Sequence, residues 1–470
     1  MLQTLFHIPH SFLGIPVFGF GWALGIWLVA SLFLIGSQAR RHGFTTEVQS
    51  YLYVLAVLGG TILWVLPGME ERDGPDGEIL GLAIRSYGLF MLLGVVGGVG
   101  LAAWRAKLMG LDPEIIFSLA MVLFVTGIIG ARLVYVVQYW NTQFAPTSSA
   151  LEEDMWKAIG QALLKVVNIP GGGLVVYGSL IGGLLGLLIF CRVWELSPLA
   201  VADLIAPSFM IGLCLGRIGC LMNGCCYGGL CDQPWAIQFP MKEAARHSAP
   251  LSPPYSHQLA VGQLHGIRMA PTDDNLAIRV VEVLPQGPAA DSGLKAGDVI
   301  VAIRSEKLDK PVPSQTGGPP QPPDAFRRAQ VLFQSSPPDI EVTLKDGRVI
   351  GWTVVNEAQE KGYPAWTLPV HPTQIYAAIN AGLMCLLLLA VYPYRRHDGE
   401  VLSLLLVLYG ISRILEESIR DDESKSFFLG MTISQNISVV MIVGAVALWL
   451  YVTLRKEPLA LPIEPKPAAS

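Results

Sequence analysis

The sequence predicts a polytopic α-helical membrane protein with about nine transmembrane helices and a small soluble α+β domain between the sixth and seventh helices. Hydrophobic residues make up 52% of the 470 residues, charged residues only 15%, and the mean hydropathy is +0.48. A soluble globular protein is less apolar than this. Apolar runs long enough to cross a bilayer recur along the chain, and one polar stretch with the alternation of β-strands interrupts them.

The apolar runs are the expected spans. The first run has no basic segment before it and no small-residue cleavage site after it, so we expect a retained helix rather than a signal peptide. The runs extend from Phe18 to Gly36, Tyr51 to Leu66, Tyr87 to Trp104, Ile115 to Val137, Leu174 to Val193, Val201 to Met222, Ala377 to Tyr392, Val401 to Ile419 and Ile433 to Val452.

Basic residues after every odd span predict the orientation, because positively charged loops stay in the cytoplasm. The amino terminus is then outside and the carboxyl terminus is cytoplasmic. An acidic loop, residues 67–81, falls on the outer side in the same scheme. The basic residues are Arg40, Arg41, Arg105, Lys107, Arg192, Arg395, Arg396, Arg455 and Lys456.

Five segments follow from this pattern. Two additional spans (1–70) precede the first part of a membrane core (71–257), an extracytoplasmic domain (258–356), the second part of the core (357–456) and a Pro-rich tail (457–470). In the soluble domain AIRVVEV and DIEVTL alternate as strands, GPAADSGLKAGDVIVAI predicts a short helix, a turn and a strand, and PVPSQTGGPPQPPDAF predicts a flexible loop.

The stretch 216–229, GRIGCLMNGCCYGG, closes an apolar span with Arg217 at the edge of the hydrocarbon. An ionisable group there is costly and indicates function. One alternative is an arginine that extends to the lipid headgroups. The surrounding glycines favour a close approach of backbone to a ligand or a second helix.

The predicted topology places polar residues of several spans at the outer membrane face, which indicates one polar cavity rather than independent surface groups. These residues are Tyr87, Arg132, Tyr177, Arg217, Asn223, His371, Arg413, Glu417 and Arg420.

Arg413, Glu417 and Arg420 are spaced i, i+4 and i+7, hence on one helix face. Two arginines around one carboxylate leave a positive charge that suits a phosphate or phosphoglycerol headgroup, and a self-satisfied ion cluster is the alternative. The glycines of 171–183, among them Gly172 and Gly173, permit helix packing or a close approach to a ligand, and packing is expected for most of them.

Seven cysteines include a group of four, and spacing alone leaves a disulfide, a metal site and plain thiols open. In an outer loop Cys220 or Cys225 can pair with Cys231, and we expect a Cys225–Cys231 disulfide. We expect no metal, because no second ligand pair has the usual spacing. The net charge of −5 and the absence of basic runs exclude nucleic acid as a partner.

The motifs RSYGLF, GARLVYVV, PGGGLVVYGSLIG, ADLIAPSF, GRIGCLMNGCCYG, HPTQIY and SRILEESIRD occur in this order. From Tyr87 to the end, apart from the inserted domain, the chain resembles the prolipoprotein diacylglyceryl transferases. The resemblance implies an enzyme of the bacterial inner membrane without a cofactor. It would transfer the diacylglyceryl group of phosphatidylglycerol to the lipobox cysteine of a prolipoprotein, forming a thioether and releasing glycerol phosphate.

The same resemblance implies roles for single residues. Arg217 is the signature arginine, and Arg217 and Arg413 would hold the phosphate while Glu417 orients Arg413. The other matches are Tyr87 at the substrate cavity, the signature pair Asn223 and Gly224, the aspartate Asp203, and the further basic residue Arg420.

The sequence departs from the family at Tyr177, where a histidine is usual, and at Cys220 and Cys225, which replace an asparagine and a glutamate. A lipobox thiol has an ordinary pKa near 8.5 and reacts as thiolate. Either Tyr177 or His371 accepts its proton, or the arginines alone favour the thiolate.

Residues Gly287 to Ile303 resemble bacterial PDZ domains, which bind an extended exported peptide along a strand edge. The matching edge is HGIRM, with Gly266, Ile267 and Met269 as the expected peptide contacts. A spacer or lid is the alternative role.

The sequence lacks the signatures of two other classes of membrane protein. An intramembrane metalloprotease needs HExxH, which the sequence lacks, and a transporter would show repeated halves. A catalytically altered relative that binds anionic membrane lipid and recruits exported proteins is the remaining alternative.

Overall fold

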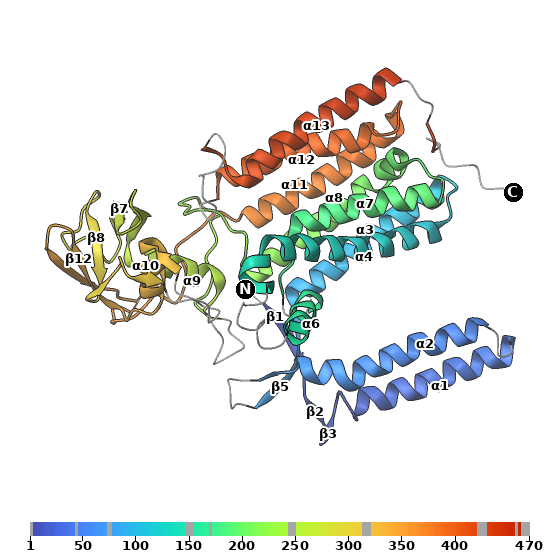
Figure 1. Ribbon diagram of the computed structural model, residues 1–470, viewed down its shortest axis with the longest axis horizontal. Helices are drawn as coiled ribbons and strands as arrows, with labels where there is room; N and C mark the ends of the chain where they lie inside the picture. Colours follow the sequence, from blue (N-terminus) through green and yellow to red (C-terminus); the bar gives the residue numbers. More distant parts are fainter. Residues whose placement is uncertain are drawn as a thin grey trace. The chain divides into compact units, whose positions relative to one another are not determined.

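The computed structural model describes residues 3–42, 46–72, 78–145, 155–168, 172–242, 251–312, 321–356, 358–420, 430–455 and 459–461 (Figure 1). The chain forms two compact units. The first comprises Met1–Phe90, Arg217–Ile375 and Ile419–Asp422, and the second comprises Met91–Gly216, Tyr376–Ser418 and Glu423–Ser470.

Among the residues that the structure describes, six helices are long and apolar enough to cross a membrane, which supports the polytopic class predicted from the sequence. They are α3 (Ser86–Leu108), α4 (Pro113–Gln138), α7 (Val176–Val193), α8 (Pro198–Asn223), α11 (Thr373–Val391, prolonged to Tyr394 by a 3-10 turn) and α13 (Ile433–Arg455).

The expected count of about nine is not reached by these criteria. The three remaining predicted spans are nevertheless helical: α1 (Trp22–His42), α2 (Thr46–Gly60) and α12 (Glu400–Ser418). In α1 and α2 the apolar portions are short. Helix α12 does not meet the criteria because it is too highly charged: Arg413 and three glutamates lie on it. A further helix, α6 (Met155–Val167), was not predicted.

Glycines set the contact between α4 and α7 in the second unit. A Cβ at Gly178 would lie 2.4 Å from the carbonyl oxygen of Gly130, and a Cβ at Gly182 would lie 2.2 Å from that of Thr126. Neither position has room for a methyl group, so the two backbones touch. Gly178 and Gly182 of the 171–183 motif are therefore packing residues, as predicted for most of its glycines, whereas a Cβ at Gly183 on the same helix would meet nothing within 4 Å.

Asp203 of α8 holds the start of α12. Its two carboxylate oxygens accept hydrogen bonds from the backbone N–H groups of Gly399 and Leu402, both at 2.7 Å. These donors belong to the first turn of α12, where helical N–H groups have no partner within the helix. The aspartate carried over from the family thus acts here as a helix cap, and the side chain is fully buried.

In the first unit, the strands of a small sheet stand before and after the two amino-terminal helices in the sequence. Strand β1 (Thr4–Ile8) pairs antiparallel with β5 (Ile79–Arg85), which also pairs with β4 (Glu71–Arg72). The α1–α2 segment therefore begins and ends next to the same pair of strands, β1 and β5. A short ribbon, β2 (Ser11–Phe12) with β3 (Ile15–Pro16), stands between β1 and α1.

The inserted domain is a six-stranded sheet in the order β13-β12-β8-β7-β6, with β9 beside β8. Figure 1 shows α9 and α10 next to it. Isoleucines, valines, Phe333 and Trp352 form its core. The bounds are α9 (Pro253–Ala260), β6 (Ile267–Pro271), β7 (Ile278–Val283), β8 (Val299–Ile303), β9 (Glu306–Lys307), α10 (Ala325–Gln334), β12 (Asp339–Leu344) and β13 (Val349–Thr353).

Both strands predicted by alternation, in AIRVVEV and DIEVTL, are confirmed as β7 and β12. The short helix predicted in GPAADSGLKAGDVIVAI is wrong, because residues 285–293 form successive turns. Gly287 packs against Gly266, and Gly293 takes a left-handed φ of 85°, which ends each turn before a helix develops. The proline-rich loop closes through β10 (Pro311–Val312) and β11 (Gln321–Pro323), and its middle, 313–320, lies outside the described residues.

His265 makes the inserted domain sensitive to acid. Its ring is fully buried against Phe333, Trp352 and Tyr363, and burial lowers the pKa of the imidazole to about 4. In the unfolded chain the pKa is near 6.5. Between these values the unfolded chain binds a proton that the folded domain does not. The free energy of unfolding should therefore fall by about 1.4 kcal/mol for each pH unit from 6.5 down to 4, and be unaffected by this group above 6.5.

Hydrogen exchange of β6 and β8 in the full chain measures this, after correction for the intrinsic pH dependence of exchange. Protection should fall between pH 7 and pH 4.5 more steeply in the native protein than in His265→Gln, whose side chain does not titrate. Identical slopes would show that titration of His265 does not cause the loss of protection.

Candidate functional site

The carboxyl end of α8 and the loop after it carry the signature stretch. The helix ends at Asn223, and the chain turns through Gly224 with φ of 75° and Cys226 with φ of 59°. A left-handed conformation is unfavourable for cysteine by roughly 1–2 kcal/mol and persists where surrounding contacts impose it. Here those contacts are hydrogen bonds from Thr373 and Gln374 to the loop.

Hydrogen bonds connect the signature loop, residues 224–229, to the HPTQIY motif. Thr373 Oγ1 donates to the Cys226 carbonyl at 2.6 Å, and Gln374 Nε2 donates to the Cys225 carbonyl at 2.8 Å. The backbone of His371 exchanges two bonds with the loop, accepting from Gly228 and donating to Gly229. Two motifs separated by about 150 residues thus form one rigid structure. Thr373 and Gln374 were not singled out from the sequence, although they stand in the same motif as His371.

Gly228 has to be glycine for this arrangement. A Cβ there would lie 2.7 Å from the Cβ of His371. The predicted site residue His371 is therefore held beside the signature loop by its backbone.

The start of α3 packs on the end of α8. A Cβ at Gly219 would lie 3.3 Å from the ring of Tyr87, and 40% of the Tyr87 residue is exposed. Arg217 acts electrostatically on both Tyr87 and Cys226. The amino-terminal segment also reaches this place, since Gln3 Nε2 donates to the Asn223 carbonyl at 3.0 Å. Tyr87, Arg217 and Asn223 are thus brought together within the first unit.

Arg420 lies beyond the helix on which the sequence placed it. Helix α12 ends at Ser418, so the i, i+4, i+7 prediction fails for Arg420. Directly after the helix, the Ile419 carbonyl accepts a hydrogen bond from the N–H of Gly229 in the signature loop. Arg420 instead belongs to the first unit, and its charge acts on Cys226.

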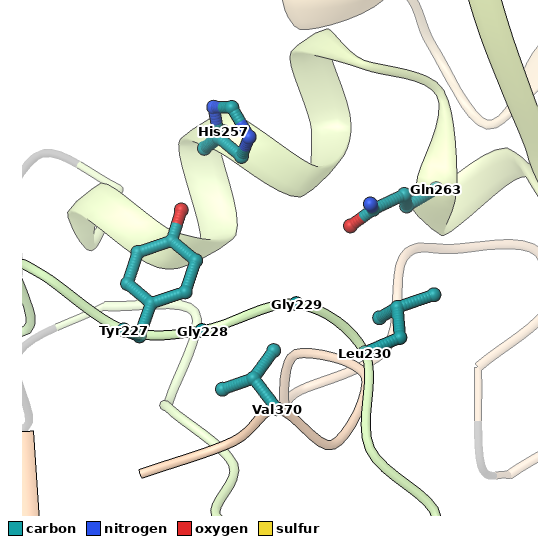
Figure 2. A pocket seen from close by; sticks show the side chains of 7 residues that line it. All are labelled: Tyr227, Gly228, Gly229, Leu230, His257, Gln263 and Val370. Atoms are coloured by element: carbon teal, nitrogen blue, oxygen red, sulfur yellow. The ribbon is translucent and has the colours of Figure 1, made fainter. Parts of the chain in front are cut away.

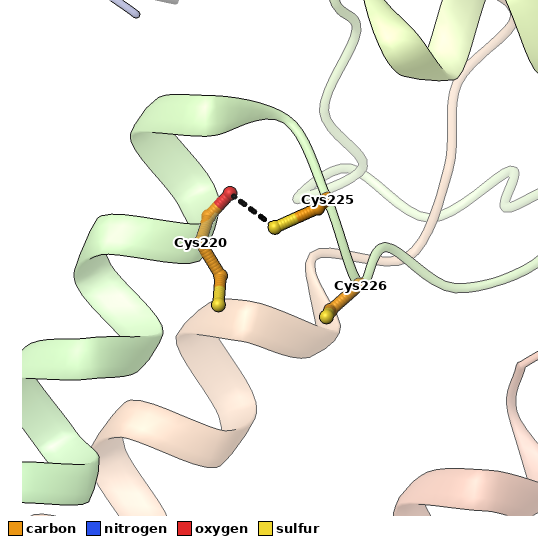
Figure 3. Close-up of side chains that lie close together, drawn as sticks. All are labelled: Cys220, Cys225 and Cys226. Carbon is orange, nitrogen blue, oxygen red and sulfur yellow. Dashed lines mark hydrogen bonds between the residues drawn. The ribbon is translucent and has the colours of Figure 1, made fainter. Parts of the chain in front are cut away.

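Three cysteines meet at this place. Figure 3 shows the side chains of Cys220, Cys225 and Cys226 converging from the last turns of α8 and the loop, and their sulfur atoms lie within 4.8 Å of one another. Hydrogen bonds from the other two thiols, and then the charges of Arg217 and Arg420, lower the pKa of the Cys226 thiol. All seven cysteines are free in the structure, so the expected Cys225–Cys231 disulfide is not formed there. Cys231 is buried, and Cys225 has the two other thiols as neighbours instead.

A cavity of about 10 Å³ lies between the signature loop and α9 (Figure 2). Tyr227 and His257 face each other across it, with ring centroids 6.2 Å apart. The volume suits about one water molecule and is too small for a lipid headgroup.

In the second unit, Arg413 and Glu417 form the ion pair that their spacing predicts. Arg413 Nη2 lies 2.8 Å from Glu417 Oε2 and donates to Ser434 Oγ at 3.2 Å. The Glu417 carboxylate is buried, with 1% of the residue exposed, while Glu416 is more distant at 3.9 Å from the guanidinium. Glu417 and Ser434 therefore fix the direction of the guanidinium.

The Arg132 guanidinium is bonded to the backbone of one segment, and its predicted contact with the substrate stays a prediction. All five N–H groups of its guanidinium donate to backbone carbonyls, which leaves none for a phosphate in this arrangement. The side chain lies at the carboxyl end of α6, where a positive charge is favourable. The acceptors are the carbonyls of Lys165 (2.6 Å), Val166 (2.8 Å), Asn168 (3.0 Å), Gly172 (2.7 Å) and Gly173 (2.9 Å).

The carbonyl oxygens of Gly172 and Gly173 thus accept hydrogen bonds from the Arg132 guanidinium. Both have left-handed φ angles, 86° and 83°, and a Cβ at Gly173 would lie 2.3 Å from the Tyr135 ring. Tyr177 follows in the first turn of α7, with 39% of the residue exposed. Arg132, Tyr177, Arg413 and Glu417 all belong to the second unit, and a cavity shared with the residues around Arg217 stays a prediction.

An Arg132→Lys variant should be destabilised, because one ammonium group cannot reach five carbonyls. Each charge-assisted bond contributes about 1.5–3 kcal/mol, so we expect a loss of about 3 kcal/mol in the free energy of unfolding. Thermal unfolding in detergent measures this, with the exposed Arg192→Lys on α7 as control. An unchanged melting temperature combined with a raised KM for lipid would instead assign Arg132 to the substrate.

Comparison with known proteins identifies the family. The model of the prolipoprotein diacylglyceryl transferases matches residues 77–273 and 327–451, and so includes the signature loop, the HPTQIY motif and the Arg413–Glu417 pair. The chain belongs to the prolipoprotein diacylglyceryl transferase family. The family members that it resembles are named as transferases, and the membrane-spanning helices agree with such an enzyme.

Named relatives of this transferase family cover different shares of the chain. The phosphatidylglycerol–prolipoprotein diacylglyceryl transferase of Rhodopirellula baltica is 33% identical over 95% of this chain and 88% of its own length. That of Thermosynechococcus vestitus is 32% identical over 37% of this chain and 59% of its own, and transferase 2 of Clostridium perfringens is 31% identical over 38% and 63%.

The part that the family model leaves unmatched, residues 274–326, lies inside the inserted domain. It contains β7, β8 and β9 and ends at the first residues of α10. The unmatched residues are therefore the middle of this domain, whereas β6, most of α10, β12 and β13 lie within the matched ranges.

Proposed function

We propose that the protein transfers the diacylglyceryl group of phosphatidylglycerol to the lipobox cysteine of prolipoproteins. The thiol sulfur forms a bond to the glycerol carbon of the lipid. The bond from that carbon to the phosphate oxygen breaks, its electron pair stays on the oxygen, and glycerol phosphate leaves. The names of the relatives support these substrates.

One observation carries the proposal within the chain itself. Arg217 on α8 and Arg420 after α12, from segments about 200 residues apart, both act on Cys226. Two guanidinium charges at one place, beside a rigid loop of glycines, form an anion site. Phosphate is the anion that the proposed lipid substrate provides.

The remaining residues receive roles from their contacts. Arg413, oriented by Glu417 and Ser434, stabilises the charge that develops on the leaving phosphate. Asn223 and Gly224 form the turn that presents Arg217, and Tyr87 lines the lipid side. Arg132 would stabilise the loop between α6 and α7 without contacting the substrate itself.

The thiol proton has two candidate acceptors, Tyr177 and His371. If either is the base, its variant Tyr177→Phe or His371→Ala should lose transfer at neutral pH and regain part of it at higher pH, where the substrate is already thiolate. If both variants retain transfer, the arginines alone favour the thiolate.

Complementation tests the proposed function. A bacterial strain depleted of its own diacylglyceryl transferase should grow when this chain is expressed, and Arg217→Gln should abolish the rescue while the protein is still inserted in the membrane. Lipid binding without rescue would favour the catalytically altered relative.

We further propose the finer topology and the peptide site. About nine spans, an outer amino terminus, a cytoplasmic carboxyl terminus and a periplasmic inserted domain follow from the charge pattern. Alkaline phosphatase fused within the inserted domain should be active, and fused after residue 455 inactive. An exported peptide would add along β6, which ends the sheet order and starts beside Gly266, at Ile267 and Met269. Loss of peptide binding in Met269→Pro would support this PDZ-like role.

A further inference from the structure

The three thiols of Cys220, Cys225 and Cys226 form a cluster for which the proposed transfer has no need. Their sulfur atoms come from one helix end and one loop and converge on the same point (Figure 3). We propose that this cluster is a binding site for a thiophilic metal cation, monovalent copper. The proposal does not depend on the transferase activity.

The geometry needs little adjustment. The sulfur atoms lie within 4.8 Å of one another. Thiolate bonds to a metal are about 2.3 Å long, which places three sulfurs in a plane around one ion roughly 4 Å apart. The widest pair in the structure is therefore within about 1 Å of the required separation.

The donor set selects the ion. Among the described residues, the group contains three cysteines and no fourth His, Cys, Asp or Glu ligand. Structural zinc almost always takes four ligands, whereas soft thiolates suit Cu(I), which accepts three. The sequence alone predicted no metal because it lacked a second ligand pair, and a three-coordinate ion removes that requirement.

The surrounding charges complement the loaded site. Three thiolates around one Cu(I) leave two negative charges. Arg217 and Arg420, which both act on Cys226, supply two positive charges. A bound ion would therefore be stabilised by the same two guanidinium groups to which we assign the phosphate.

The backbone holds the ligands in place before any ion binds. The carbonyl of Cys225 is fixed by Gln374, and that of Cys226 by Thr373. Cys226 keeps its left-handed φ of 59°, and Cys225 Sγ lies 3.7 Å from the Cys220 carbonyl oxygen. Loading then requires only that each ligating thiol release its proton to solvent as its sulfur–copper bond forms. Copper enters and stays as Cu(I), so no oxidant or reductant takes part in the step.

The test uses the reduced full-length protein in detergent, without oxygen, titrated with Cu(I) against a chromophoric Cu(I) chelator. We expect one ion per chain with a thiolate-to-copper absorption in the near ultraviolet. Cys226→Ser and Cys220→Ser should each weaken binding at least tenfold. Cys231→Ser, which removes a buried thiol outside the cluster, should leave binding unchanged.

X-ray absorption at the copper edge of the loaded native protein gives a readout that no variant can confound by misfolding. Three sulfur neighbours at about 2.3 Å are expected. Fewer than three sulfurs, equal binding by Cys226→Ser, or a disulfide joining two of these three cysteines in the protein as isolated would overturn the proposal.

Occupancy has one consequence that rests on the proposed function. The charges of Arg217 and Arg420 would stabilise the copper-loaded cluster and would then be less available to the lipid phosphate. One equivalent of Cu(I) should therefore raise the KM for phosphatidylglycerol in the native protein. Copper binding without any effect on KM would contradict the shared use of the arginines and leave the metal site itself supported.

Discussion

Replacing Glu417 by glutamine should lower kcat/KM for diacylglyceryl transfer by about 100-fold while the protein still folds. The carboxylate holds Arg413 at 2.8 Å from inside the protein, and a neutral amide cannot fix a guanidinium in the same way. Loss of one preorganised group that stabilises developing negative charge lowers rates by about 10²–10³. The effect should fall mainly on kcat, because the charge on the leaving phosphate develops in the transition state.

Glu416→Gln is the matched control. It removes the neighbouring carboxylate, which is 3.9 Å from Arg413 and accepts a hydrogen bond from Ser412 instead. Transfer by membranes containing each variant, normalised to the amount of folded protein, should fall strongly for Glu417→Gln and by less than about fivefold for Glu416→Gln. Equal losses would mean that the net charge of this helix end matters rather than the orientation of Arg413.

The Arg413–Glu417 pair was predictable because both residues stand on one helix, where spacing determines contact. Arg420 was misplaced for the opposite reason. Nothing in SRILEESIRD ends a helix, yet α12 ends at Ser418, and the Ile419 carbonyl accepts from the N–H of Gly229 in a distant part of the chain. The prediction failed because local periodicity does not show where a helix ends or which distant segment the chain then contacts.

Arg132 and the cysteines show the same limit. An arginine in an apolar run is energetically costly and needs hydrogen-bond partners, and the sequence correctly indicates this need. It does not reveal that the partners are five carbonyls of the segment 165–173, because backbone carbonyls carry no sequence signal. Likewise the sequence does not show that Cys226 takes a left-handed conformation with its carbonyl bonded to Thr373, or that Cys225 lies beside the thiols of Cys220 and Cys226.

Glycine packing gives the second large effect, on stability. A Gly182→Ala variant should lose about 3 kcal/mol or more in the free energy of unfolding, because the new methyl carbon would lie 2.2 Å from the Thr126 carbonyl oxygen. That atom belongs to the backbone of α4 and cannot rotate away, so α4 and α7 must separate. Separation also removes the close backbone contact that holds helices together in lipid, where no hydrophobic effect replaces it.

The adjacent Gly183→Ala variant is the control, since a Cβ there meets nothing within 4 Å. Alanine favours a helix over glycine by about 1 kcal/mol, so this variant should melt at the native temperature or slightly above it. Two identical substitutions at neighbouring positions thus have opposite expected signs. Thermal unfolding in detergent, followed by size-exclusion chromatography of the heated samples, measures both, and equal melting temperatures would show that α4 and α7 tolerate the added carbon by moving apart at no cost.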